Sequence, residues 1–232
     1  MNKVGTCNTA NRTAWVEAAL KKIPAGSRLL DAGAGEQPYR RASSHLLYVS
    51  QDFAKYDGKG DGRGLQQGKW DQTKLDLVCD IAAIPEPDGS FDAILCTEVF
   101  EHLPEPLLAL REFSRLLRPG GQLILTAPFV SFTHFAPYHF STGFNRYYYE
   151  THLPAHGCEI VEMTPNGNYF ELIAQEVRHA RKIARRYTAF SARPLERLAT
   201  SVVLRMLARF SNAGPDSSEF ACFGYHVRAV KR

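Results

Sequence analysis

The sequence predicts a doubly wound α/β fold, in which helices cover both faces of a mostly parallel sheet. Two observations favour this class. Apolar runs typical of buried strands alternate with segments of helical period over residues 1–165, which is the pattern of βα units. A glycine turn at residues 33–35 directly follows the first apolar run, where backbone amides can approach a small ligand without a Cβ in the way. The 232 residues, 44% of them apolar, suffice for one large core, so we expect a single domain over residues 1–232.

The strands are predicted from short apolar runs that end at turn residues. Their approximate bounds are residues 28–32, 47–52, 75–80, 91–97, 122–127 and 159–164, with a last strand within residues 220–230. A helix opened by Pro104 and Pro106 is predicted to continue to about Leu117. The RPGG sequence at residues 118–121 should end it, because proline and glycine are helix stop signals.

Three further segments do not fit a simple βα unit. Residues 54–74 carry five glycines among charges, and we expect a mobile surface loop that either covers a ligand or has no function. Residues 129–157 form an insertion after the fifth strand. Residues 168–211 are predicted to be a helical insertion before the last strand, with a stripe of apolar residues that we expect to pack rather than to anchor the chain in a membrane. The stripe consists of Leu195, Leu198, Val202, Met206 and Phe210.

The formal net charge of +4 is modest, but basic residues crowd into one stretch of the helical insertion. They are Arg178, Arg181, Lys182, Arg185, Arg186, Arg193, Arg197, Arg205 and Arg209. Such a run is typical of a solvated helix face. The functional alternative is weak contact with an anionic membrane surface or a phosphorylated substrate. We do not expect nucleic acid as a partner, because the sequence contains no recognisable nucleic-acid module.

Cysteine usage and hydropathy predict a cytoplasmic protein. The five cysteines lie far apart and include no C-x-x-C pair, which suits a reducing compartment. The amino terminus lacks an apolar signal stretch, and no segment reaches the ~18 consecutive apolar residues of a membrane span.

Three sequence segments carry a resemblance to a known family. They are RLLDAGAGEQPY at residues 28–39, DGSFDAILCTEVFEHL at 88–103 and LLRPGGQLILTAPF at 116–129. In their order, spacing and residue identities, these segments resemble class I S-adenosylmethionine-dependent methyltransferases, specifically the small bacterial type 11-like group. The resemblance covers about residues 29–164. It implies a Rossmann-like, seven-stranded sheet with an antiparallel last strand, S-adenosyl-L-methionine as the cofactor, and methyl transfer as the activity.

Three carboxylates are predicted at the ends of successive strands, namely Asp31, Asp52 and Asp80. Ligands of open α/β sheets bind at the carboxyl ends of the strands, and these groups could accept hydrogen bonds from ammonium, ribose hydroxyl and adenine amino groups. The resemblance implies more specific roles. It places Asp31, Gly33 and Gly35 under the methionine moiety, Asp52 at the ribose, Asp80 and Ile81 beside the adenine, and Thr97 and Glu98 along the methionine.

A nicotinamide enzyme is the main rival, because GAG and an acid 19 residues after Gly33 also suit a dinucleotide fingerprint. Pro38 stands where that fingerprint needs its third small residue, beside a pyrophosphate. S-adenosylmethionine has no pyrophosphate, so the proline favours the methyltransferase. Many relatives have a further glycine where this chain has EQPY, which leaves roles at Glu36 and Gln37 unassigned.

The acceptor site is predicted in the histidine-rich segment after the fifth strand. It resembles an H-x-x-P-x-D-F-x-R-Y segment of relatives, although His139 stands where those have an acid. A hydroxyl acceptor needs a positioned base, and histidine suits this at neutral pH. We expect His139 or His134 as the base, with Tyr138 and Arg146 shaping the pocket. Glu98, Glu101 and His102 come second, with His102 expected to bind the substrate.

No metal is expected, because the sequence shows no carboxylate or cysteine at ligand spacing from His134 and His139. The predicted function is O-methylation of a small-molecule or sugar-type acceptor. Nitrogen or carbon acceptors remain open. A non-catalytic S-adenosylmethionine-binding module with a basic helical interaction surface is the alternative from another class.

Overall fold

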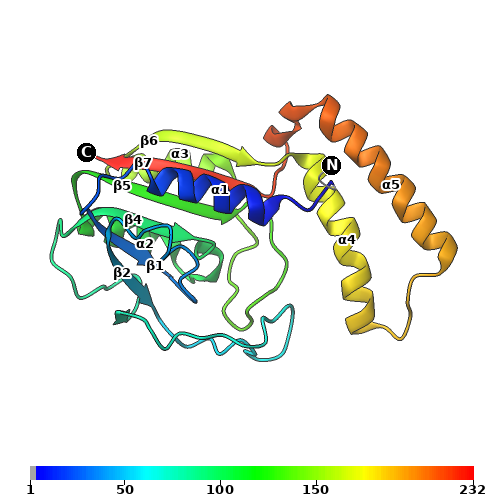
Figure 1. The fold of residues 1–232 in the computed structure, drawn as a ribbon, viewed down its shortest axis with the longest axis horizontal. Helices are drawn as coiled ribbons and strands as arrows, with labels where there is room; N and C mark the ends of the chain where they lie inside the picture. The colour runs from blue at the N-terminus through cyan, green and yellow to red at the C-terminus, as the bar shows by residue number, and fades with distance from the viewer. Residues whose placement is uncertain (1–3) are drawn as a thin grey trace. The chain divides into compact units, whose positions relative to one another are not determined.

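In a computed structural model, which describes residues 4–232, the chain divides into two compact units (Figure 1). The larger unit combines residues 14–164 with 224–232 and contains the sheet. The smaller unit combines the described residues up to Thr13 with residues 165–223 and contains two long helices. Each unit is described by itself.

A seven-stranded sheet forms the larger unit. Its strands are β1 (Arg28–Ala32), β2 (Leu47–Asp52), β3 (Leu77–Val78), β4 (Phe91–Thr97), β5 (Leu117–Pro128), β6 (Cys158–Asn166) and β7 (Gly224–Lys231). The strand order is β3-β2-β1-β4-β5-β7-β6. Strands β1 to β5 pair in parallel, whereas β7 runs antiparallel to β5. This confirms the predicted fold class, including the antiparallel last strand.

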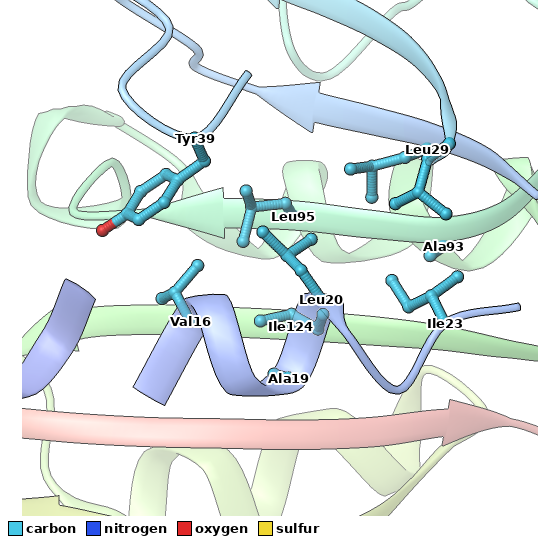
Figure 2. Close-up of a cluster of buried hydrophobic side chains, with 10 residues drawn as sticks. Val16, Ala19, Leu20, Ile23, Leu29, Tyr39, Ala93, Leu95 and Ile124 are labelled. Atoms are coloured by element: carbon cyan, nitrogen blue, oxygen red, sulfur yellow. The ribbon is translucent and has the colours of Figure 1, made fainter. Parts of the chain in front are cut away.

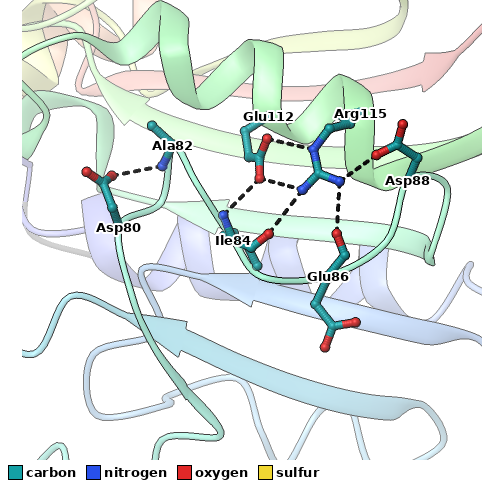
Figure 3. A network of polar contacts seen from close by, with 7 residues as sticks. All are labelled: Asp80, Ala82, Ile84, Glu86, Asp88, Glu112 and Arg115. Carbon is teal, nitrogen blue, oxygen red and sulfur yellow. Dashed lines mark hydrogen bonds and ion pairs between the residues drawn. The ribbon is translucent and has the colours of Figure 1, made fainter.

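The helices are α1 (Asn8–Leu20), α2 (Pro106–Leu116), α3 (Arg146–Ala155), α4 (Tyr169–Tyr187) and α5 (Pro194–Ala213), with short 3-10 helices η1 (Phe100–His102) and η2 (Pro215–Glu219). One face of the sheet packs against α1. Val16 and Leu20 of α1 bury against Leu29, Leu95 and Ile124 of β1, β4 and β5 (Figure 2). Helix α2 lies on the opposite face (Figures 1 and 3), so the sheet is covered on both sides as the alternating pattern predicts.

Strands β1, β2 and β4 have the predicted bounds, but β3 is limited to two residues. Side-chain hydrogen bonds take the place of part of the backbone pairing between β2 and β3. The Asp76 carboxylate accepts hydrogen bonds from the Ser50 amide at 2.8 Å and the Ser50 hydroxyl at 2.6 Å. Pairing of β2 with β3 therefore begins only at Leu77, and Asp80 lies two residues beyond the strand.

The helix opened by Pro106 ends next to the RPGG sequence, as predicted, but RPGG itself belongs to the following strand. Helix α2 ends at Leu116, and residues 118–121 lie inside β5. Leu117 pairs with Phe91, and the next pair joins Ala93 to Gln122. The extra residues form a bulge in which Gly120 has a φ of +79°, because glycine permits this conformation in a strand as readily as at a helix end.

In the smaller unit, α4 and α5 bury Ala174 and Leu207, with Leu204 and Ala208 packed beside them. The predicted stripe of Leu195, Leu198, Val202, Met206 and Phe210 is mainly exposed, which contradicts the expectation that it packs. The Phe210 ring, at the end of the stripe, lies 5.4 Å from the Phe170 ring of α4. Helix α5 has apolar residues on two faces, and the periodicity does not show which one contacts α4. Within residues 4–232, no helix combines the length and apolarity that a membrane crossing requires.

A network around Arg115 joins α2 to the segment between β3 and β4 (Figure 3). The guanidinium donates to the carboxylates of Glu112 and Asp88, each at 2.6 Å, and to the carbonyls of Ile84 at 3.0 Å and Glu86 at 2.8 Å. Glu112 also accepts a hydrogen bond from the Ile84 amide at 2.8 Å. Hydrogen bonds from Arg115 keep the pKa of Glu112 below its usual value of 4.5.

We predict that Arg115→Ala lowers the free energy of unfolding by about 2–3 kcal/mol at pH 7, because Glu112 loses its cation and several charge-assisted bonds disappear. Urea unfolding measures this. The pKa of Glu112 is lowered on folding, so the stabilisation is present above pH 4.5 and is lost as the pH falls through the lowered value. The loss caused by Arg115→Ala should therefore shrink in acid. Arg111→Ala, at an exposed position of the same helix, is the control, and equal losses in both variants would contradict the prediction.

Candidate active site

The turn after β1 can be made only by glycine at two positions. Gly33 and Gly35 have φ values of +74° and +52°, a region that other residues enter at a cost of about 1–2 kcal/mol. A Cβ on Gly33 would lie 2.5 Å from the Val99 side chain, and one on Gly35 would lie 2.7 Å from Trp70. The bare backbone of this turn is therefore in close contact with two neighbouring segments.

Asp52, at the end of β2, holds this turn in place. One oxygen of its buried carboxylate accepts from the Gly35 amide at 3.0 Å, and the other accepts from the Ala54 amide at 2.9 Å. A carboxylate offers about four acceptor positions, so Asp52 retains capacity for a ligand. Asp52 thus lies at the predicted place, beside the glycine turn.

Gln51 is a structural member of the site that the sequence reasoning missed. Its side chain accepts from the Gly33 amide at 3.2 Å and donates to the Cys79 carbonyl at 2.7 Å. It therefore joins the ends of β1, β2 and β3. A buried glutamine before an acid carries no sequence signal of its own.

The other two predicted carboxylates lie in different surroundings. Asp31 is 2% exposed and accepts a hydrogen bond from the Tyr48 hydroxyl. Burial raises the pKa of Asp31 to about 7. Asp80 is exposed and accepts from the Ala82 amide at 2.9 Å (Figure 3), with Ile81 buried beside it. The structure therefore places Asp52 against the glycine turn, Asp80 on the surface, and Asp31 against the partly buried Tyr48.

Strand β4 ends at Thr97, and Glu98 follows with a side chain that accepts from the Thr126 hydroxyl at 3.0 Å. Glu98 has a φ of +54°. Among residues 4–232, the other non-glycine residues with positive φ are Gln37, Ala54 and Phe135. Three of the four follow β1, β2 and β4, and the fourth lies in the insertion after β5. Backbone strain of this kind clusters at functional sites, so it supports a site along the carboxyl edge of the sheet.

The structure brings three of the predicted histidines together. Glu101 and His102 lie in η1 after β4, whereas His134 and His139 come from the insertion after β5. Rings of His102 and His134 are 4.6 Å apart, and those of His134 and His139 are 4.9 Å apart. Glu101 is buried, with 1% of the residue exposed. Its carboxylate lies 3.7 Å from Nε2 of His102 and 3.9 Å from Nε2 of His134. We call these four residues the histidine cluster.

Backbone carbonyls fix the tautomers of two of these rings. Nδ1 of His102 is 2.5 Å from the Tyr138 carbonyl, and Nδ1 of His134 is 2.9 Å from the Phe132 carbonyl. A carbonyl only accepts, so each Nδ1 carries the proton and each Nε2 is the basic nitrogen. Burial lowers the pKa of His102 to about 3, and burial and His134 lower the pKa of His139.

Glu101, His102 and His134 could also hold a metal ion, since their ligand atoms all lie within 4.8 Å of one another. Two imidazoles and a carboxylate are a known donor set for zinc. The sequence alone shows no carboxylate at ligand spacing, because Glu101 lies far from His134 along the chain. The absence of a metal therefore stays a prediction.

The glycine-rich loop, residues 54–74, pairs with the insertion after β5. The Leu65 amide donates to the Thr133 carbonyl at 3.0 Å, and the Phe135 amide donates to the Leu65 carbonyl at 2.9 Å. The Phe135 ring stacks on Tyr56 at 4.4 Å and on His102 at 5.0 Å, and it contacts Trp70 at 5.3 Å. Trp70 of this loop contacts the glycine turn, and Phe135 of the insertion contacts both Trp70 and His102. The two side chains therefore link the glycine turn to the histidine cluster.

Tyr138 and Arg146 were both predicted to shape the acceptor pocket. The Tyr138 ring meets Phe53 edge-on at 4.9 Å, and its carbonyl contacts His102, so Tyr138 adjoins the histidine cluster. Arg146 is exposed at the start of α3 and pairs with Glu150 at 2.6 Å. A pocket role for Arg146 stays a prediction.

Comparisons with known proteins find similar methyltransferases. Residues 30–125 match the family model of a methyltransferase domain. The chain is 33% identical over 121 residues to a ubiquinone biosynthesis O-methyltransferase of Xanthomonas axonopodis pv. citri, covering 50% of this chain and 48% of that protein. It is 31% identical over 112 residues to the 27-O-demethylrifamycin SV methyltransferase of Amycolatopsis mediterranei, covering 47% and 41%. The chain thus spans about half the length of the curated relatives it matches.

A solved structure of an S-adenosylmethionine-dependent methyltransferase from Archaeoglobus fulgidus superposes with a TM-score of 0.56 at 13% identity, covering 94% of each chain. At this identity the match shows the fold. Together the comparisons confirm the resemblance: residues 30–125 match a methyltransferase domain, and the chain has the fold of class I methyltransferases. They also bear out S-adenosylmethionine as the predicted cofactor.

We predict that Gly33→Ala costs more stability than Gly26→Ala, although both positions have positive φ values, +74° and +79°. A Cβ on Gly26 meets nothing within 4 Å, so only the backbone strain of about 1–2 kcal/mol applies. At Gly33 the clash with Val99 adds about 1–3 kcal/mol. Urea unfolding measures the difference, and calorimetry should show loss of S-adenosylmethionine binding in the Gly33 variant alone. Equal effects in both variants would contradict this account of the turn.

Proposed function

We propose that the chain transfers a methyl group from S-adenosylmethionine to an oxygen atom of a small-molecule or sugar-type acceptor. One observation carries the proposal: the segments following β1, β2, β4 and β5 supply both the glycine turn with Asp52 and the histidine cluster, along one edge of the sheet. The curated relatives are named as O-methyltransferases of small molecules, which supports oxygen as the nucleophile.

The residues at this edge suit the cofactor. The methionine moiety would lie beside the turn at Gly33 and Gly35, flanked by Thr97 and Glu98. The Asp52 carboxylate would accept hydrogen bonds from the ribose hydroxyls with the lone pairs that the two backbone amides leave over. Asp80 and Ile81 would bind the adenine from the end of β3. Asp31, which accepts a hydrogen bond from the Tyr48 hydroxyl, would lie under the methionine moiety.

When bound, the sulfonium supplies an already activated methyl group, so the chain must chiefly orient the acceptor and exclude water. The residues suited to this task are the aromatic side chains of Tyr56, Trp70 and Phe135, which lie between the glycine turn and the histidine cluster. They would shield the reacting atoms from solvent. Tyr138, Arg146 and His102 would contact the acceptor.

The histidine cluster would remove the proton of the acceptor hydroxyl. As the oxygen bonds to the methyl carbon and the carbon–sulfur bond breaks, the proton would pass to Nε2 of His134 or to His139. Glu101, 3.9 Å from Nε2 of His134, would stabilise the resulting imidazolium, since a nearby carboxylate favours the charged ring. General base catalysis of this kind contributes about 10²–10⁴-fold.

We predict that the chain binds S-adenosylmethionine and S-adenosylhomocysteine but not NAD in calorimetry. Asp52→Ala should weaken S-adenosylmethionine binding by about 10–100-fold, because a hydrogen bond to a charged group contributes about 1.5–3 kcal/mol. Glu219→Ala removes an exposed acid elsewhere and should leave binding unchanged. Incubation with methyl-labelled cofactor and a metabolite extract should label a small molecule. Binding without turnover on any extract would favour a non-catalytic module, and NAD binding would favour the nicotinamide alternative.

We predict that His134→Gln or His139→Gln lowers kcat by about 10²-fold or more. Because the pKa of His139 is lowered from 6.5, a His139 base stays neutral at pH 7, and activity should fall only as the pH drops below 6.5. His156→Gln, in the same insertion but bonded to the His152 carbonyl, is the control.

A chelator distinguishes the two chemical roles of the histidine cluster. Extended treatment with EDTA should leave activity unchanged if the cluster works as a base. Full activity in both the His134 and His139 variants would overturn the assignment. So would a loss in EDTA that zinc restores, which would identify Glu101, His102 and His134 as metal ligands.

A further inference from the structure

The α4–α5 hairpin, residues 169–213, has a larger net positive charge than the chain as a whole. It contains nine arginines and lysines and three glutamates, a net charge of +6 against +4 for the whole chain. The three glutamates are already engaged. Glu171 accepts from the Gly5 amide at 2.5 Å, Glu176 contacts His179 at 3.3 Å, and Glu196 accepts from the Arg193 amide at 2.7 Å. Eight of the nine basic residues, all except Arg178, are exposed.

One face of α5 exposes apolar side chains over its full length. Leu195, Leu198 and Val202 are 75%, 61% and 56% exposed. Met206 and Phe210 continue the same line at positions 11 and 15 residues after Leu195, which is the spacing of one helix face. The packed residues of α5, such as Leu207, lie on the other side. A soluble monomer seldom exposes an apolar strip of this size without a binding role.

The exposed apolar strip is bordered by arginines and ends in aromatic residues. Arg205 and Arg209 lie three residues after Val202 and Met206, along its border. At the connection between the two helices, Tyr187 and Phe190 are 60% and 77% exposed. Aromatic residues of this kind are enriched where a protein meets the membrane interface.

A groove between α4 and α5 adds a place for an anionic group. Its volume is about 370 Å³, and its lining includes the basic residues Arg181, Arg185 and Arg197 beside the apolar Val177 and Phe190. Arginine guanidinium groups bind phosphate oxygens in a fork geometry. The groove therefore combines the two chemistries of a phospholipid, a phosphate group and an apolar chain.

We propose that the α4–α5 hairpin docks on the surface of an anionic lipid bilayer. The apolar strip of α5 enters the interface, Tyr187 and Phe190 lie at the level of the headgroups, and the arginines pair with lipid phosphates. Charge complementarity selects this occupant: a net charge of +6 favours an anionic surface, and a nucleic acid would leave the apolar strip in water. The hairpin lies on the surface without crossing the bilayer, as amphipathic helices of this composition do.

Sedimentation with vesicles tests the proposal on the full chain. The protein should bind phosphatidylcholine vesicles that contain about 30% phosphatidylglycerol, and binding should weaken with salt and be absent on pure phosphatidylcholine. Arg205→Glu with Arg209→Glu should lower the partition coefficient at least about 25-fold, at about fivefold per charge. The control is Arg41→Glu with Arg111→Glu, which reverses two exposed charges of the other unit.

A second variant pair tests the apolar strip. Val202→Asp should reduce binding at least about fivefold, whereas Val161→Asp, at a position 47% exposed on β6, should not. Circular dichroism and calorimetry with S-adenosylmethionine establish that each variant is folded, so failure of the docking leaves the proposed methyl transfer untouched. Equal binding to neutral vesicles overturns the proposal. So does wild-type binding by Val202→Asp with full competition by heparin, which would identify a general polyanion site.

Discussion

The larger unit depends on one constraint at the carboxyl edge of its parallel strands, the contact of the Asp52 carboxylate with the amides of Gly35 and Ala54. The two amides belong to the segments after β1 and β2, so one side chain fixes the ends of two parallel strands. The neighbouring Gln51 connects β2 to the segment after β3, because its side chain donates a hydrogen bond to the Cys79 carbonyl. The contact in turn requires glycine at positions 33 and 35, because the turn runs against Val99 and Trp70 without space for a Cβ. The geometry of this edge, where we propose that the cofactor binds, therefore depends on a few atoms.

Strained backbone conformations and ionisable side chains lie along the same edge. Glu98 takes a left-handed conformation just before the 3-10 helix that positions Glu101 and His102. The insertion after β5 brings His134 and His139 to these residues and is itself held by the glycine-rich loop. Segments distant in the sequence thus meet where the parallel strands end, as expected for a doubly wound sheet. The smaller unit contributes a different property, a basic and apolar surface outside the methyltransferase domain match.

Local patterns predicted what depends on local structure. Strands β1, β2 and β4 have the expected bounds, because apolar runs and turn residues mark both ends of each. Helix α2 ends within one residue of the predicted position, but the sequence did not show that residues 118–121 form a bulge in β5, since proline and glycine occur in both settings. The apolar residues of α5 were expected to pack, but periodicity alone does not show whether Leu195 or Leu207 faces α4. Asp52 was identified from its position at a strand end, whereas Gln51 and the meeting of Glu101 with His134 depend on which strands become neighbours.

The most direct test of the central claim is a crystal structure of the chain with S-adenosylhomocysteine bound. We expect the ribose within hydrogen-bonding distance of Asp52, the amino acid portion over Gly33 and Gly35, and the sulfur directed toward the histidine cluster. A ligand bound elsewhere, or one that reaches this edge without contacting Asp52, would contradict the account.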